Sequence, residues 1–295
     1  MAAAATVAAS VSESIKIDVW SDIACPWCYI GKRNLEKGLA ETSADVDAPI
    51  AEVTFHSFEL SPDTPVEFEG DELDFLAGHK GIPREQVRQM LDSVTAVAKA
   101  AGLEYRFDLL NHTNTVKAHE LLHFAKANGL QYELQERLMS AYFTEGRHLG
   151  RIDELVALAT DVGLDADAAR QALEGSQYVD AVRADQAQAA AYGINGVPFF
   201  VIDGKYGVSG AQPPEAFAQV ARQVWAERRE ALRSGRYLDA VRADQAQATA
   251  YGINGVPFFV IDGKYGVSGA QPADAFAQIV RQVWAERRED ATVGA

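Results

Sequence analysis

A direct repeat in the C-terminal half constrains the fold of this chain more than any other feature. Residues 178–230 and 237–289 are identical at 47 of 53 positions, at an offset of 59 residues. Two copies are too few for a solenoid, which needs at least three repeats. We therefore interpret the repeat as a tandem duplication of part of one domain. Removing one unit leaves 236 of the 295 residues as the functional length.

Hydrophobic patterning predicts three groups of elements along the chain. The first group is strand, helix, strand, at residues 15–20, 25–40 and 52–58. The second is a series of helices, at residues 84–101, 115–128, 131–143, 152–162 and 166–174. The third, in the first copy of the repeat, is helix, strand, strand, helix, at residues 178–192, 199–202, 205–208 and 214–229. Asp203-Gly204 predicts a type I′ turn between the last two strands. This order predicts a mixed sheet with helices on both faces and a helical insertion.

Composition favours a folded globular protein and disfavours two classes of partner. The chain is 48% hydrophobic and 23% charged, as folded domains are. Its net charge of −15 predicts no binding to nucleic acid, because an acidic surface repels phosphates. No apolar run is long enough to predict a membrane span. Residues 1–14 lack the basic start of a secretory signal, so we interpret them as a disordered tail on a cytoplasmic protein.

The chain contains two cysteines, Cys25 and Cys28, in a Cys-Pro-Trp-Cys motif between a predicted strand and a predicted helix. A thiolate at a helix start faces free backbone N–H groups and the positive end of the helix dipole, which stabilise its charge. We therefore predict that Cys25 is the nucleophile and that Cys28 resolves the mixed disulfide. The alternatives are a passive pair or half of a structural zinc site, which would need two further ligands.

Residues 119–123 match the HExxH pattern of zinc metalloproteases, with His119 and His123 on one predicted helix. The extended form of that motif needs glycine at position 126 and histidine at position 129, where Lys126 and Gly129 stand. The short pattern is loose enough to arise by chance. We therefore predict no metal site and no cofactor.

Several stretches in a fixed order resemble the DsbA-like thioredoxin-fold oxidoreductases, specifically their FrnE-like branch. The stretches that carry the resemblance are residues 20–32, 58–62, 114–119, 141–146 and 193–200. Together they span about residues 15 to 230. The resemblance implies an α/β protein with a thioredoxin fold, an inserted all-helical domain and a duplicated C-terminal helix-strand-strand-helix unit. It also implies dithiol–disulfide exchange.

On this basis the thioredoxin-like domain comprises residues 15–62 and 176–230, with a helical insertion at 63–175 and the duplicate at 231–295. Either copy of the repeat could complete the fold. The first follows the helical insertion directly, so we favour it. The leftover copy would pack poorly on its own chain or swap into a neighbour, which predicts concentration-dependent homodimers.

The resemblance also implies residues that bind substrate. In thioredoxin-like folds a cis proline faces the dithiol, and Val197-Pro198 match that position. Val197 would offer its backbone to substrate as an added strand does. Val256-Pro257 are the same motif in the second copy. Asn114 and His119 either line the cleft above the dithiol or serve as a helix cap and a partly buried histidine.

The active-site dipeptide Pro26-Trp27 separates the two cysteines. DsbA-type oxidants usually carry histidine at the position of Trp27, which helps to stabilise the thiolate. Trp27 lacks that donor, so we expect a weaker oxidant. Asp22 either disfavours the thiolate or is a solvated turn residue, and we favour the second interpretation.

The leading hypothesis is therefore a cytoplasmic thiol–disulfide oxidoreductase. Its substrate would be a protein or small molecule that contains a disulfide or thiols. Its reductant would be a low-molecular-weight thiol or a thioredoxin-type protein. One alternative is a glutathione-dependent isomerase of the 2-hydroxychromene-2-carboxylate type, although those enzymes typically lack a complete CxxC motif. The other is a non-enzymatic chaperone that binds apolar segments through the helical insertion.

Overall fold

The computed structural model describes residues 14–42, 50–235 and 237–293. The chain divides into two compact units, Met1–Glu227 and Arg228–Ala295. The tail expected at residues 1–14 lies outside the described residues, except for Ser14. Within the described residues, no helix is both long and apolar enough to cross a membrane.

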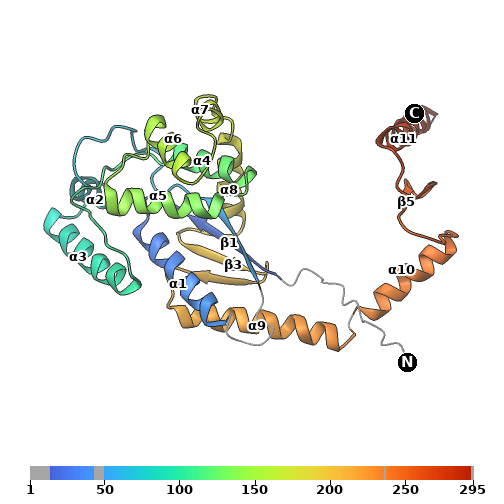
Figure 1. Cartoon of the computed structure of the whole chain (residues 1–295), viewed down its shortest axis with the longest axis horizontal. Helices are drawn as coiled ribbons and strands as arrows, with labels where there is room; N and C mark the ends of the chain where they lie inside the picture. Colours follow the sequence, from blue (N-terminus) through green and yellow to red (C-terminus); the bar gives the residue numbers. More distant parts are fainter. Residues whose placement is uncertain (1–13, 43–49, 236, 294–295) are drawn as a thin grey trace. The chain divides into compact units, whose positions relative to one another are not determined.

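A four-stranded mixed sheet forms the centre of the first unit, in the strand order β2–β1–β3–β4 (Figure 1). The strands are β1 (Ile15–Ser21), β2 (Ala51–Ser57), β3 (Phe199–Ile202) and β4 (Tyr206–Ser209). β1 runs parallel to β2 and antiparallel to β3, and β4 runs antiparallel to β3. The mixed sheet predicted from the sequence is confirmed. β3 and β4 belong to the first copy of the repeat, so that copy shares a sheet with the N-terminal strands.

Three residues, Asp203 to Lys205, join β3 to β4. Asp203 and Gly204 have φ angles of 58° and 66°. Two successive positive φ values define the type I′ turn, which the Asp-Gly dipeptide predicted.

Helices cover both faces of this sheet. α1 (Pro26–Thr42) and α9 (Pro214–Arg233) lie on one side in Figure 1, where Leu35 and Phe217 pack with Val19 and Phe200. α8 (Val179–Ala191) covers the other face, where Ala189 packs with Trp20. Two apolar layers therefore enclose the sheet.

A series of helices lies between β2 and α8: α2 (Glu72–Lys80), α3 (Arg84–Ala101), α4 (Val116–Ala127), α5 (Gln131–Glu145), α6 (Ile152–Asp161) and α7 (Ala166–Glu174). Their core is continuous with the dithiol, because Cys25 and Cys28 pack in one cluster with Leu121, Leu138 and Phe143. The helical insertion therefore forms part of the environment of the two sulfur atoms.

The sequence analysis missed α2. Its start carries a capping box, in which the Asp71 side chain accepts from the backbone of Asp74 and the Asp74 side chain accepts from the backbone of Asp71. Gly81 ends the helix with a φ of 64°, and Pro83 follows. These two local signals could have located the helix, whereas its short apolar pattern could not.

The second unit repeats the last four elements of the first. They are α10 (Leu238–Ala250), β5 (Phe258–Ile261), β6 (Tyr265–Ser268) and α11 (Ala273–Val293). The ring centroids of Phe259 and Phe276 are 4.8 Å apart, as are those of Phe200 and Phe217 in the first unit. β5 and β6 form a two-stranded sheet of their own.

Candidate active site

The two cysteines lie where β1 leads into α1. Cys25 directly precedes the helix, and its carbonyl accepts a hydrogen bond of 3.0 Å from the N–H of Cys28. The predicted position of the motif, between a strand and a helix start, is therefore confirmed. Both residues are free thiols. Cys25 is 4% exposed and Cys28 is 2% exposed.

The two thiols differ in their access to the cavity at this site. Cys25 lines a cavity of about 690 Å³, together with Pro26 and Trp27, whereas Cys28 is not among the lining residues. Burial raises the pKa of the Cys28 thiol, and the neighbouring Cys25 raises it further. Cys28 is therefore a protonated, enclosed thiol at neutral pH, and a substrate in the cavity meets Cys25 first.

The loop that contains Val197 and Pro198 faces the dithiol. The Cys25 thiol lies 3.7 Å from the Val197 carbonyl oxygen, and the peptide bond before Pro198 is cis, as the family resemblance implied. Gly31 on α1 makes this approach possible, because a Cβ there would lie 2.9 Å from Pro198 Cγ. The peptide bond before Pro257, in the second unit, is also cis.

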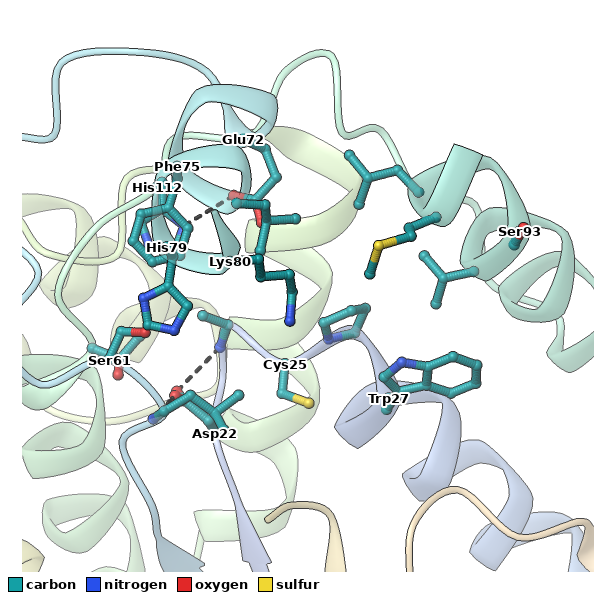
Figure 2. A pocket seen from close by; sticks show the side chains of 18 of the residues that line it. Asp22, Cys25, Trp27, Ser61, Glu72, Phe75, His79, Lys80, Ser93 and His112 are labelled. Carbon is teal, nitrogen blue, oxygen red and sulfur yellow. Dashed lines mark hydrogen bonds and ion pairs between the residues drawn. The ribbon is translucent and has the colours of Figure 1, made fainter. Parts of the chain in front are cut away.

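The cavity wall opposite the dithiol comes from α2 and α3 (Figure 2). The lining of the cavity includes large, partly exposed apolar side chains: Trp27, Leu60, Met90 and Val97, which are 44%, 46%, 42% and 42% exposed. His79 and Lys80 from α2 add polar groups to the lining, and the Lys80 side chain extends into the cavity in Figure 2. The cavity therefore combines an apolar surface with a cation.

A hydrogen bond between His112 and Glu72 fixes the inner part of α2 in this wall. His112 Nδ1 lies 2.9 Å from Glu72 Oε2, as the dashed line in Figure 2 marks, and both side chains are buried. The His112 ring also stacks on Phe75, with ring centroids 3.3 Å apart. These contacts hold the lining residues of α2 against the segment that precedes α4.

The sequence analysis missed the α2–α3 wall. α3 was predicted at its correct bounds, and its buried stripe of Val87, Leu91, Val94 and Ala98 follows helical spacing. Met90 and Val97 flank that stripe and are the extra apolar residues that reach the cavity. The apolar face of α3 is wider than its contact with the core requires, and this width is the signal that could have identified Met90 and Val97 in the sequence.

Asn114 and His119 are not among the residues that line the cavity. The Asn114 amide donates to the Pro62 carbonyl at 2.8 Å, and its oxygen accepts from the N–H of Val116 at the start of α4 at 2.9 Å. His119 is 1% exposed. Neither residue therefore lines this cavity: Asn114 binds the backbone at a helix start, and His119 is more deeply buried than the alternative of a partly buried histidine expected.

Asp22 is buried, so its interpretation as a solvated turn residue is wrong. Its carboxylate accepts hydrogen bonds from the N–H groups of Leu60 and Ala24, at 2.7 and 3.3 Å. His119 Nε2 lies 3.4 Å from Asp22 Oδ1, which is an ion-pair distance without hydrogen-bond geometry. Burial opposes ionisation, but the imidazole and the two N–H groups outweigh it and lower the pKa of Asp22. Asp22 also lines the cavity, so it places a negative charge in its inner wall.

The residues of the HExxH pattern contact different partners. His119 faces Asp22, whereas His123 Nε2 lies 3.1 Å from both Ser57 Oγ and Asp185 Oδ2. Glu120 forms an ion pair with Lys117 at 2.8 Å. Within residues 14–42, 50–235 and 237–293, no cluster of three or more His, Cys, Asp or Glu side chains is arranged to hold a metal ion.

Comparisons with known proteins agree with this geometry. The model of the DSBA-like thioredoxin domain family matches residues 16–222 and again 219–281. The uncharacterized protein YwbO of Bacillus subtilis (strain 168) is 33% identical over 208 residues, which are 69% of this chain and 94% of YwbO.

Two solved structures place the fold in the same group. The probable DsbA oxidoreductase SCO1869 from Streptomyces coelicolor is 41% identical, with a TM-score of 0.67 over 72% of this chain and 91% of that chain. The cytosolic disulfide reductase DsbM from Pseudomonas aeruginosa with GSH shares the fold at 18% identity, with a TM-score of 0.51 over 71% of this chain and 98% of that chain. With a family match over most of its length, the chain belongs to the DsbA-like family of thioredoxin-fold oxidoreductases.

Proposed function

We propose that the protein exchanges disulfides with its substrate through Cys25 and Cys28, with Cys25 as the nucleophile. The observation that carries this proposal is the position of the Cys25 thiol, which lines the cavity and lies 3.7 Å from the Val197 carbonyl oxygen. Cys28 lies one helical turn behind it and is enclosed. This asymmetry matches the division between an attacking and a resolving thiol.

The exchange proceeds in two steps. The Cys25 thiolate attacks one sulfur of a substrate disulfide, forms a mixed disulfide, and releases the other substrate sulfur as a thiolate. Cys28 then loses its proton and attacks Cys25 Sγ, which forms the Cys25–Cys28 disulfide and releases the second substrate thiolate. A low-molecular-weight thiol or a thioredoxin-type reductant restores the dithiol. In the opposite direction the same steps oxidise a substrate dithiol.

The cavity supports an extended, apolar stretch of a protein substrate. The side chains of Trp27, Leu60, Met90 and Val97 offer apolar contacts beside Cys25. The backbone of Val197 provides the groups that would pair with an extended chain next to the sulfur. Lys80 would favour a carboxylate on the same substrate. A complete Cys25–Cys28 pair also favours exchange over glutathione-dependent isomerisation.

Reduction of insulin and trapping of the mixed disulfide test the proposal. We expect wild-type protein to reduce insulin in the presence of a thiol reductant. We expect Cys25→Ser to abolish the reaction. Cys28→Ser should accumulate a mixed disulfide at Cys25 that mass spectrometry detects, because the resolving thiol is missing. A mixed disulfide that forms on Cys28 in the Cys25→Ser variant, at the wild-type rate, would reverse the two roles.

A further inference from the structure

The second unit exposes apolar residues whose counterparts the first unit buries. Val182 on α8 and Phe200 on β3 are both 0% exposed. Their counterparts Val241 and Phe259 are 49% and 41% exposed. Trp284 on α11 is 67% exposed, whereas its counterpart Trp225 on α9 packs against the core of the first unit. The sequence of the second unit therefore still encodes a surface made for burial.

The difference arises at one strand edge. In the first unit β3 has β4 on one side and β1 on the other, with Val201 opposite Asp18 and Val19 opposite Phe200. The N–H of Asp203 donates to the Lys16 carbonyl of β1 at 2.7 Å. Within the described residues β5 pairs with β6 alone. The edge of β5 that corresponds to the β1-facing edge of β3 therefore presents unpaired backbone groups, which are a template for another strand. A two-stranded hairpin is also marginal by itself.

Exchange of halves between chains does not cover this surface. Each chain supplies one N-terminal part, β1–α1–β2, and two copies of the helix-strand-strand-helix half that can complete it. If one chain inserts its second copy into a neighbour, it displaces the neighbour's first copy. Every exchange therefore leaves one open half per chain. The open face is covered only when leftover halves meet each other.

Net charge does not oppose contact between two such units. Residues 228–295 carry nine basic and eight acidic side chains, whereas the rest of the chain carries a net charge of −16. A nearly neutral surface associates with little repulsion, and a strongly acidic one does not. Two such units therefore meet with almost no repulsion from net charge.

We propose that residues 228–295 form a homodimerisation module in which β5 of one chain pairs antiparallel with β5 of a second chain. Antiparallel pairing of identical edges is compatible with a two-fold axis, so the contact closes as a dimer. The resulting sheet has the strand order β6–β5–β5–β6. In it β5 regains the antiparallel neighbour that β3 has in β1.

Val260 is the residue at which to test this edge. The counterpart of Val260 in the first unit is Val201, which lies two residues before Asp203 on the same strand. Backbone N–H groups two residues apart in a strand point to the same side, so the N–H of Val201 faces β1, as the N–H of Asp203 does. The N–H of Val260 therefore faces the open edge of β5. Val260→Pro removes that donor and leaves the hydrogen bonds to β6 in place. Val260→Lys places a charge on the edge.

Sedimentation velocity of the full chain over a range of concentrations measures the association. We expect wild type to sediment with twice the chain mass and to dissociate on dilution. Both Val260 variants should associate about tenfold more weakly or remain monomeric. Ile50→Lys is the matched control, because Ile50 is 74% exposed in the first unit, and it should behave as wild type. A wild type that is monomeric at every concentration overturns the proposal, as does a dimer that neither Val260 variant weakens.

Cross-linking covers the case in which a Val260 variant disturbs the fold of the unit. Val260→Cys and Val256→Cys are each placed in a Cys25→Ser, Cys28→Ser background and oxidised. We expect Val260→Cys to form a disulfide-linked dimer more readily than Val256→Cys, although Val256 is the more exposed residue, at 91%. Equal cross-linking at both positions, or none at Val260→Cys, contradicts pairing of β5. The cross-linking does not depend on the proposed exchange activity, because its background lacks both active-site thiols.

Discussion

Cys25 and Cys28 are three residues apart but have different surroundings. Cys25 faces a cavity and the Val197 carbonyl, whereas Cys28 is enclosed by the core that the helical insertion shares with α1. Burial raises the pKa of Cys28, so this thiol remains protonated near neutral pH. The reactivity of the pair is therefore expected to reside in Cys25.

Alkylation measures this difference directly. In the reduced protein near neutral pH, iodoacetamide should modify Cys25 and leave Cys28 unmodified, because the thiolate is the reactive form. Peptide mapping by mass spectrometry identifies the labelled residue. The Cys28→Ser variant, as a control, should be labelled at the wild-type rate. Preferential labelling of Cys28 in the wild type would show that burial does not control reactivity here.

At the scale of single elements, α1 positions the site through a glycine that a larger residue could not replace. A Cβ at Gly31 would lie 2.9 Å from Pro198 Cγ and 3.2 Å from the ring of Phe200. Gly31→Ala should therefore push the Val197–Pro198 loop away from the dithiol, reduce the exchange rate, and lower the free energy of unfolding by about 1–3 kcal/mol.

Gly78 in α2 is the matched control for this substitution. A Cβ at Gly78 would meet nothing within 4 Å. Gly78→Ala should leave the exchange rate unchanged and raise the free energy of unfolding by up to about 1 kcal/mol, since alanine favours the helix. Urea unfolding and insulin reduction measure both effects. Equal behaviour of the two alanine variants would show that the close approach at Gly31 does not matter.

An ionic network joins α1 to α5. The Glu136 carboxylate accepts hydrogen bonds from Lys32 at 2.7 Å, from Tyr29 at 2.7 Å and from Arg33 at 2.9 Å. The Lys32 side chain is 2% exposed, so its charge depends on these partners. Burial opposes ionisation of Glu136, but the Arg33, Lys32 and Tyr29 donors outweigh it and lower its pKa to about 2.

The lowered pKa predicts how this network depends on pH. Glu136 contributes stability that is fully present above about pH 5 and is lost as the pH falls toward 2, because the unfolded chain then binds the proton more tightly. Glu136→Gln should lower the free energy of unfolding by about 2 kcal/mol at pH 7, after allowance for partial exposure, and by less at pH 3. Glu133→Gln, at an exposed position of the same helix, should change it little. Urea unfolding at both pH values measures this, and a loss that is equal at pH 7 and pH 3 would contradict it.

For the molecule as a whole, the sequence difference between the two copies favours the first in the sheet. Ala221 on α9 is 1% exposed and packs with Phe200 and Phe217. The second copy carries Val280 at the equivalent position. Two extra methyl groups in a filled core cost about 1–3 kcal/mol. The first copy therefore fits the N-terminal half better.

Deletion of residues 231–289 tests which copy completes the active site. We expect the shortened chain to retain the wild-type exchange rate, because β3, β4 and the Val197–Pro198 loop remain. Insulin reduction measures the rate, and Pro198→Thr in the full chain should reduce it. Loss of activity in the shortened chain, together with an intact Pro198→Thr enzyme, would assign the function to Pro257.

Local signals in the sequence predicted most of the fold. Each of these signals depends only on neighbouring residues: the Asp203-Gly204 turn, the apolar strands and the helical periodicities. The bounds of the observed elements agree with the predicted bounds within a few residues. The burial of Asp22 could not be predicted, because its partners Leu60 and His119 are distant in sequence. The same holds for the cavity wall, since the contribution of α2 and α3 depends on how the insertion packs over the dithiol.

The equilibrium between the protein and glutathione redox buffers tests the central claim most directly. The fraction of protein with a Cys25–Cys28 disulfide is measured by alkylation and mass spectrometry at each buffer potential. We predict a reversible two-electron transition with a midpoint between about −270 mV, the value of thioredoxin, and about −120 mV, the value of DsbA. A pair that forms no reversible disulfide over this range would contradict dithiol–disulfide exchange as the function of the site.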